Sequence, residues 1–453
     1  MKRLATCICI LALATSCDLV RRAEPTAKPV QQADAVMVFL TGNELGELKP
    51  CGCSGGQLGG FDRRAAILNS VPRQRRLVVD AGSFVAGDTE QDLIKFNIVI
   101  RALDLLDYDL VNLTEKDVEI ASNLGLLNSI GSLFNIISAQ QLADGNVPAK
   151  FTKRLPLRKE NVAVTVAAFD ARSSPIEQID RLFADNTAAQ SFNILILTGC
   201  YPGVIDIIAK SALAVDCLVC PADSDEPRVI SEPNSRPLTF SMGRFGRYVC
   251  RLQVTKDAEG KLKLDFQSLP VQEKLRQEPA LVGLYKDYQQ LVKEHNLVQK
   301  YPRFLLADGL KFVGSDACRS CHPYEYQQWR TTAHAHAYAT LEKVGSQFDP
   351  ECVVCHVVGM EYESGFISQE QTAHLKDVGC ENCHGPGSEH TKSLGKVKTA
   401  GPKSTCLNCH TPEKSTKYAG NEPAYLEKII HWSRPKSTTD GGREQGRSQV
   451  SNL

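Results

Sequence analysis

The sequence predicts an α/β layered domain followed by a mostly α-helical, irregular domain. In the first part of the chain, short apolar runs that end in Asp, Thr or Gly alternate with segments of helical periodicity, as expected of buried strands that feed loops. In the last part strand signals are sparse, and the pattern Cys-x-x-Cys-His occurs four times. The 453 residues are enough for two or three domains. A net charge of zero and 7% aromatic residues argue against a nucleic-acid binder.

The elements of the first domain follow from these runs in chain order. Strands are predicted within the runs 36–40, 76–82 and 193–199, and an amphipathic helix at 92–106. The segment 247–266 alternates like a pair of antiparallel strands. We therefore expect an α/β layered sandwich over residues 34–270.

The rest of the chain divides by composition. Residues 271–311 carry leucines and tyrosines at helical spacing among charges, which predicts a helical connector. The segment 312–433 holds the four repeated patterns, and the polar tail 434–453 is predicted to be disordered.

The N-terminus resembles an export signal. A basic start is followed by an apolar stretch of about a dozen residues, too short to span a bilayer, and by small residues before Cys17. These features predict a signal peptide over 1–16 and resemble a bacterial lipobox, which implies lipid attachment to Cys17 and a tether over 17–33. An ordinary signal peptide with an incidental cysteine is the alternative.

Each of the four patterns is typical of c-type haem attachment. The two thiols of each motif add to the haem vinyl groups, and the histidine that follows is the proximal iron ligand. Zinc binding is the alternative for any single copy, but four copies with the same spacing favour four covalent haems. The four motifs are Cys318–Cys321–His322, Cys352–Cys355–His356, Cys380–Cys383–His384 and Cys406–Cys409–His410.

The chain has only six other histidines, and five of them lie in the motif-bearing segment. A second imidazole would close the iron and favour electron transfer, whereas an open position would permit small-molecule chemistry. The candidate distal ligands are His334, His336, His374, His390 and His431.

The segment around these motifs resembles the tetrahaem cytochrome family that takes electrons from hydroxylamine oxidoreductase. The resemblance is carried by Val313–Cys318, by Trp329 with His334, and by the run from Val378 to His390. It implies that His390 serves the first haem, His334 or His336 the third and His431 the fourth. It also implies a five-coordinate second haem at His356, which His374 could close unless it simply lies on the surface.

The first domain resembles the catalytic domain of periplasmic 5′-nucleotidases and related calcineurin-like metallophosphoesterases. Four segments stand where that family has its strand-end motifs: 41–46, 80–83, 113–117 and 197–199. A two-metal phosphoesterase needs Asp, Asn and several His residues, but this chain has no histidine before His295. Asn43, Ser83 and Lys116 replace expected ligands. We therefore expect the fold without phosphohydrolase activity.

Cysteines supply a second candidate site in the first domain. If the fold is right, Cys51, Cys53, Cys200 and Cys220 lie near the carboxyl ends of strands, where α/β domains place their sites. They could form a thiol redox site or bind a soft metal. Structural disulfides or inert roles are the alternative for these four cysteines and for Cys217 and Cys250, because the domain is exported.

Two functions follow from these observations. The first is an exported, lipid-anchored electron carrier in the periplasm or at the cell surface, which exchanges electrons with redox protein partners. The second is an oxidoreductase that acts on a small sulfur or nitrogen compound at Cys51 and Cys53, with the haems as the electron outlet.

Overall fold

The structure, a computed structural model, describes residues 35–50, 55–140, 147–184, 191–212, 214–402 and 405–432. The predicted signal peptide, Cys17, the tether, Cys51, Cys53 and the C-terminal tail all lie outside the described residues.

Two six-stranded mixed sheets form the first half of the molecule. The first sheet has the order β12 (Leu262–Pro270), β11 (Tyr248–Lys256), β1 (Val36–Thr41), β2 (Arg76–Asp80), β3 (Leu110–Asn112) and β4 (Asn135–Ile137). The second has the order β5 (Lys150–Leu157), β6 (Glu160–Asp170), β7 (Ser191–Gly199), β8 (Cys217–Cys220), β10 (Leu238–Ser241) and β9 (Arg228–Val229).

The central strands of both sheets run parallel. Antiparallel strands lie at both edges of the second sheet and at one edge of the first, whose other edge strand, β4, is parallel to β3. In the first sheet β1, β2, β3 and β4 are parallel, and β11 and β12 form the predicted antiparallel pair. The strands expected at 36–40, 76–82 and 193–199 are confirmed as β1, β2 and β7, although β2 ends at Asp80 rather than Gly82.

Alternation along the strands builds the layers. In β1, Val38 and Leu40 enter the core between the sheets, whereas Phe39 enters the core under the helices. In β6, Val166 belongs to the same inter-sheet core, and Phe169 faces the helices on the other side. The predicted α/β layered sandwich is therefore confirmed.

Helices cover both outer faces of the sandwich. The first sheet is covered by α1 (Phe61–Leu68), α2 (Glu90–Leu105), α3 (Glu115–Asn123) and α4 (Leu127–Leu133). The second sheet is covered by α5 (Ile179–Leu182) and α6 (Val204–Ser211). A capping box fixes the start of α2, because Thr89 Oγ1 accepts from Asp92 N and Asp92 accepts from Thr89 N.

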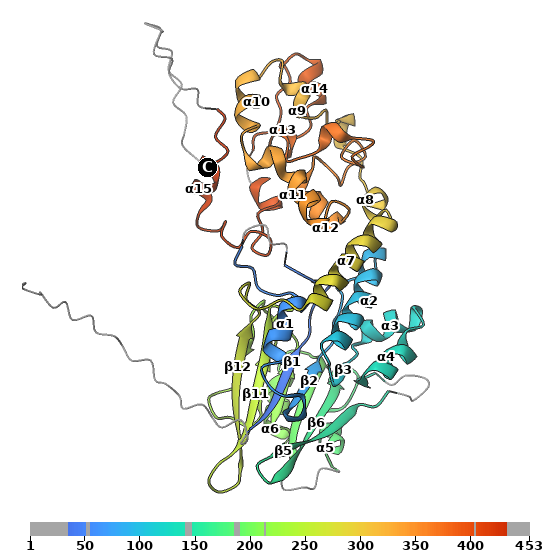
Figure 1. Cartoon of the computed structure of the whole chain (residues 1–453), viewed down its shortest axis with the longest axis vertical. Helices are drawn as coiled ribbons and strands as arrows, with labels where there is room; N and C mark the ends of the chain where they lie inside the picture. The colour runs from blue at the N-terminus through green and yellow to red at the C-terminus, as the bar shows by residue number, and fades with distance from the viewer. Residues whose placement is uncertain are drawn as a thin grey trace, which may run out of the picture.

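The predicted connector is helical, and its main helix is part of the first core. Four apolar side chains of α7 (Pro279–Glu294) are buried with α1 and α2: Leu281, Leu284, Tyr288 and Val292. Figure 1 shows α7 alongside α2, between the sandwich at one end of the molecule and the helical half at the other. A short helix, α8 (Leu297–Lys300), follows.

The second half consists of short helices and turns. Its helices are α9 (Ser315–Cys318), α10 (Pro323–Trp329), α11 (Ala337–Val344), α12 (Pro350–His356), α13 (Cys380–His384), α14 (Ser388–Lys392) and α15 (Glu422–Glu427). Between residues 301 and 432, the described residues form isolated bridges but no strand. One apolar cluster lies here, with eight buried residues from this half and Val298 from α8, so little of this half is held by side-chain packing alone.

Candidate haem sites and the junction cavity

Each Cys-x-x-Cys-His motif lies on a single helical turn. The second and third motifs end α12 and form α13, and the first and fourth begin at α9 and at a 3-10 turn, Thr405–Asn408. His322 N donates to the Cys318 carbonyl at 2.9 Å, and His410 N donates to that of Cys406 at 2.8 Å. Residues three and four apart share a helix face. Each turn therefore presents two thiols and an imidazole on the same side.

The four motifs lie in two neighbouring pairs. The Cys318 thiol of the first motif donates to the Cys380 sulfur of the third, and this hydrogen bond lowers the pKa of Cys380 to about 7. Likewise, the Cys409 thiol of the fourth motif donates a hydrogen bond to the Cys355 sulfur of the second, which lowers the pKa of Cys355 to about 7. The first and third motifs are therefore one pair, and the second and fourth are the other.

Three proximal histidines each face a second imidazole. The ring centroids are 6.0 Å apart for His322 and His390. They are 6.3 Å apart for His410 and His334, and 6.1 Å apart for His384 and His431. Two imidazoles on opposite sides of one metal ion would have centroids roughly 6 Å apart, since each metal–nitrogen bond is about 2 Å. The spacing fits an iron between each pair of rings.

The pairing differs in part from the expectation. His390 faces the first motif, as the resemblance implied, but His334 faces the fourth rather than the third, and His431 faces the third rather than the fourth. The order of motifs along the chain does not decide which distal imidazole crosses to which site. After α15 the chain returns to α13, which brings His431 to His384.

Second hydrogen bonds orient several of these rings. The Nδ1 atom of His390 lies 2.8 Å from the Val397 carbonyl, that of His431 lies 2.9 Å from the Ile429 carbonyl, and that of His410 lies 3.0 Å from Ser415 Oγ. An imidazole that donates from Nδ1 keeps Nε2 for a metal. Burial lowers the pKa of four rings and so favours the neutral form that binds metal: His334, His356, His384 and His410.

The second motif lacks a paired imidazole. His356 Nδ1 lies 2.7 Å from the Ala337 carbonyl, and no histidine ring stacks with it among the described residues. His374 is exposed on the turn Ala373–Leu375, and His336 is exposed with its Nε2 atom 3.1 Å from the Arg330 carbonyl. Among the described residues, neither His336 nor His374 has a ring contact with a proximal histidine.

In the first half, a buried guanidinium lies among the strand-end carboxylates. Arg64 Nη1 is 2.9 Å from Glu44 Oε1 and donates to Tyr108 Oη at 3.0 Å. Asp80 accepts from Thr41 Oγ1 at 2.7 Å. Burial raises the pKa of both Glu44 and Asp80.

The other residues that replace expected phosphoesterase ligands serve structural or surface roles. Asn43 and Ser83 have positive φ angles in adjoining loops, and Asn43 N donates to the Gly82 carbonyl at 2.8 Å. Lys116 lies on the surface of α3, with Nζ 3.3 Å from both Asp88 and Glu119. The described residues hold no group of three or more His, Cys, Asp or Glu side chains that could bind a metal ion.

The described cysteines of the first half are free thiols. Cys217 and Cys250 are buried in the inter-sheet core, Cys220 is buried at the end of β8, and Cys200 is exposed just after β7. Burial raises the pKa of Cys220 to about 12, which opposes a reactive thiolate. Cys200 and Cys220 do lie at strand carboxyl ends as predicted, but Cys51 and Cys53 are outside the described residues.

Sequence comparison assigns the motif-bearing half. Residues 317–385 match the family model of cytochrome c554 and c-prime. The C-terminal region is a cytochrome c554-type domain. A curated relative, cytochrome c-554 of Nitrosomonas europaea, is 32% identical over 142 residues, which is 27% of this chain and 57% of the relative. The chain thus spans little more than half the length of that relative.

Solved structures similar to this chain include nucleotidases. A 5′-nucleotidase precursor from Thermus thermophilus has a TM-score of 0.44 at 16% identity, with 69% of this chain and 68% of that chain covered. A putative 5′-nucleotidase from Staphylococcus aureus has a TM-score of 0.46 at 12% identity, with 68% and 66% covered. The NAD nucleotidase of Haemophilus influenzae has a TM-score of 0.44 at 13% identity, with 63% and 64% covered.

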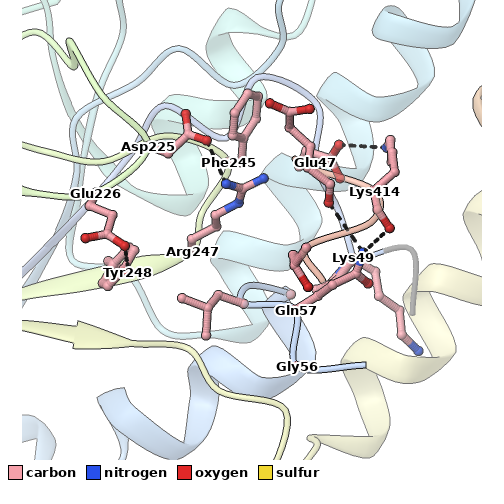
Figure 2. A pocket seen from close by; sticks show the side chains of 15 residues that line it. Glu47, Lys49, Gly56, Gln57, Asp225, Glu226, Phe245, Arg247, Tyr248 and Lys414 are labelled. Atoms are coloured by element: carbon pink, nitrogen blue, oxygen red, sulfur yellow. Dashed lines mark hydrogen bonds and ion pairs between the residues drawn. The ribbon is translucent and has the colours of Figure 1, made fainter. Parts of the chain in front are cut away.

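A cavity of about 320 Å³ lies where the sandwich meets the cytochrome c554-type domain. The first half contributes Glu47, Lys49, Gln57 and the loops around Asp225 and Arg247, and the cytochrome domain contributes the turn at Glu413, Lys414 and Thr416. Figure 2 shows Arg247 paired with Asp225, at 2.8 Å, and Lys414 with Glu47, at 3.2 Å. Sequence reasoning missed this cavity, because no motif marks residues that only tertiary contact brings together.

We expect Arg64→Met to destabilise the first half by about 3–5 kcal/mol, since it leaves the buried Glu44 carboxylate without its partner. Urea unfolding monitored by far-ultraviolet circular dichroism measures the change. The control combines Arg64→Met with Glu44→Gln, which removes the uncompensated charge and should recover much of the loss. An unchanged unfolding midpoint for Arg64→Met alone would contradict this account.

Proposed function

We propose that the chain carries four c-type haems and transfers electrons between redox protein partners. The observation that supports it best is the spacing of three imidazole pairs, at 6.0, 6.1 and 6.3 Å, each beside a Cys-x-x-Cys-His motif. A haem bound there supplies one-electron redox chemistry.

The side chains have distinct roles in this proposal. The eight motif thiols hold the haems covalently: Cys318, Cys321, Cys352, Cys355, Cys380, Cys383, Cys406 and Cys409. His322, His384 and His410 act with the distal His390, His431 and His334, so these three sites are closed to small molecules. His356 alone faces no second imidazole among the described residues, and it leaves its site open.

We place the protein outside the bacterial cytoplasm, since c-type haem is attached there, and tether it to a membrane through lipid at Cys17. Among the described residues, none of the helices combines the length and the apolar character needed to cross a bilayer. Cys17 is therefore the membrane attachment in this proposal.

Pyridine haemochrome analysis tests the haem content. After expression with haem maturation machinery, we expect four haems per chain, one for each motif. A matched variant, Cys406→Ala with Cys409→Ala, should carry three. A wild-type ratio well below four would contradict the proposal.

Substitution of the neighbouring histidines His334 and His336 tests the ligand assignment. His334→Ala removes the imidazole that faces His410, so one haem in four should change from low-spin to high-spin. His336→Ala is the control and should leave the spectrum unchanged, because that ring is exposed and faces no proximal histidine. Electron paramagnetic resonance of the oxidised protein gives the spin states. If His336→Ala changes the spin state of one haem and His334→Ala does not, the ligand is His336 instead.

The junction cavity favours a second candidate function, oxidation of a small sulfur or nitrogen compound. Pro50 and Gly56, which flank the segment that carries Cys51 and Cys53, both line the cavity, and so does Lys414, four residues after His410. In this proposal Cys51 and Cys53 form a thiol or soft-metal site, and the haems receive the electrons.

The double substitution Cys51→Ser with Cys53→Ser separates the two functions. If the chain only transfers electrons, the variant should cycle its haems with an artificial donor at the wild-type rate, and no sulfur compound should reduce either protein. If a sulfur compound reduces the wild-type haems and the double variant loses this at least tenfold, the oxidoreductase function is supported. Cys250→Ala, in the inter-sheet core, is the control for loss of any thiol.

A further inference from the structure

The helix that carries the second motif is held by the α/β half. Asp349, only 4% exposed, caps α12 by accepting from Glu351 N at 3.0 Å. The same carboxylate accepts from Gln91 Nε2 at 2.9 Å and from Tyr288 Oη at 2.9 Å. Gln91 lies on α2 and Tyr288 on α7, and both helices belong to the first core.

An ion pair reinforces this contact. Lys95 of α2 is buried, and its Nζ atom lies 2.5 Å from Glu351 Oε1. The first turn of α12 is therefore fixed by three side chains of the α/β half, and Cys352, Cys355 and His356 follow on the same helix. Any displacement of α2 or α7 would move the second motif.

The turn after the fourth motif is held by the same half. Lys414 Nζ lies 3.2 Å from Glu47 Oε1, and Gln57 Nε2 donates to the Lys414 carbonyl at 3.1 Å (Figure 2). The next residue, Ser415, is buried and bonds His410 Nδ1 at 3.0 Å. The first half thus reaches the proximal imidazole of the fourth motif through one intervening turn.

The first and third motifs are held within the cytochrome domain. Glu381, between the two cysteines of the third motif, is 4% exposed. Its carboxylate accepts from Gly314 N at 2.7 Å, from Gly387 N at 2.7 Å and from Val313 N at 3.0 Å. Glu381 is the counterpart of Asp349, since both are buried carboxylates beside a motif, but its donors all lie in its own half.

We propose that the α/β half is a positioning element for the second and fourth haem sites, acting through Tyr288, Gln91 and Lys95 on α12 and through Glu47 and Gln57 on the turn that holds His410. It sets the environment of these two haems, whereas Glu381 positions the motifs of the first and third. This rests on the proposed haem binding. The α/β half is then a tuning element for one of the two haem pairs.

The experiment compares three mild variants of the full haem-loaded chain: Tyr288→Phe, Glu47→Gln and Glu381→Gln. Optical redox titration and electron paramagnetic resonance report the haems separately. The second haem lacks a paired imidazole, and the three imidazole pairs cross at 24°, 45° and 89°, so their signals differ. Tyr288→Phe removes only the hydroxyl that donates to Asp349, so the ring still fills the core.

We expect Tyr288→Phe to shift the midpoint potential and signal of the second haem, and Glu47→Gln to shift those of the fourth, with the first and third unchanged. Glu381→Gln should shift the midpoint potentials and signals of the first and third haems and leave those of the second and fourth unchanged. The inference is overturned if Tyr288→Phe and Glu47→Gln shift no haem, or shift all four equally. A wild-type haem count below four would instead contradict the proposed function. Each variant is compared at equal haem content and equal unfolding midpoint, which separates tuning from loss of stability.

Discussion

In the proposed haem protein, the C-terminal half depends on one geometric relation: an imidazole at the end of a helical turn faces a second imidazole roughly 6 Å away, the separation that would accommodate a metal between them. Three of the four motifs meet it, with ring separations of 6.0 to 6.3 Å. The connecting chain is arranged to bring the distal rings into place, which explains its short helices and turns. The apolar core of this half is small because the prosthetic groups would fill much of its interior.

Features that leave a local pattern in the sequence, such as buried strands and the Cys-x-x-Cys-His motifs, could be predicted from it. Short continuous apolar runs identified β1, β2 and β7, because a strand buried on both faces leaves such a run in the sequence. The motif spacing predicted four haem sites, and the scarcity of histidine elsewhere suggested the distal candidates. The partners of His384 and His410 were not predictable, since His334 and His431 are distant in sequence from both and only the chain path decides between them.

The same limit explains what was missed in the first half. The sequence shows that no histidine precedes His295, but it does not show which side chain lies among the remaining carboxylates. No sequence pattern singled out Arg64, which lies in the middle of α1 with a side chain that is 1% exposed and paired with Glu44. A guanidinium is a fixed cation that cannot be lost to a chelator, so this cluster keeps a positive charge among its acids without recruiting an ion.

The burial of α7 has a consequence for how the two halves can be separated. Because Leu281, Leu284, Tyr288 and Val292 complete the core under the first sheet, a fragment that stops at the last strand, Leu262–Pro270, would expose an apolar face on α1 and α2. The natural cut lies after Lys300, beyond α8. A fragment that contains the whole sheet but lacks α7 would therefore tend to aggregate through this exposed apolar face. The joint between the α/β half and the cytochrome domain is therefore part of the core of the α/β half.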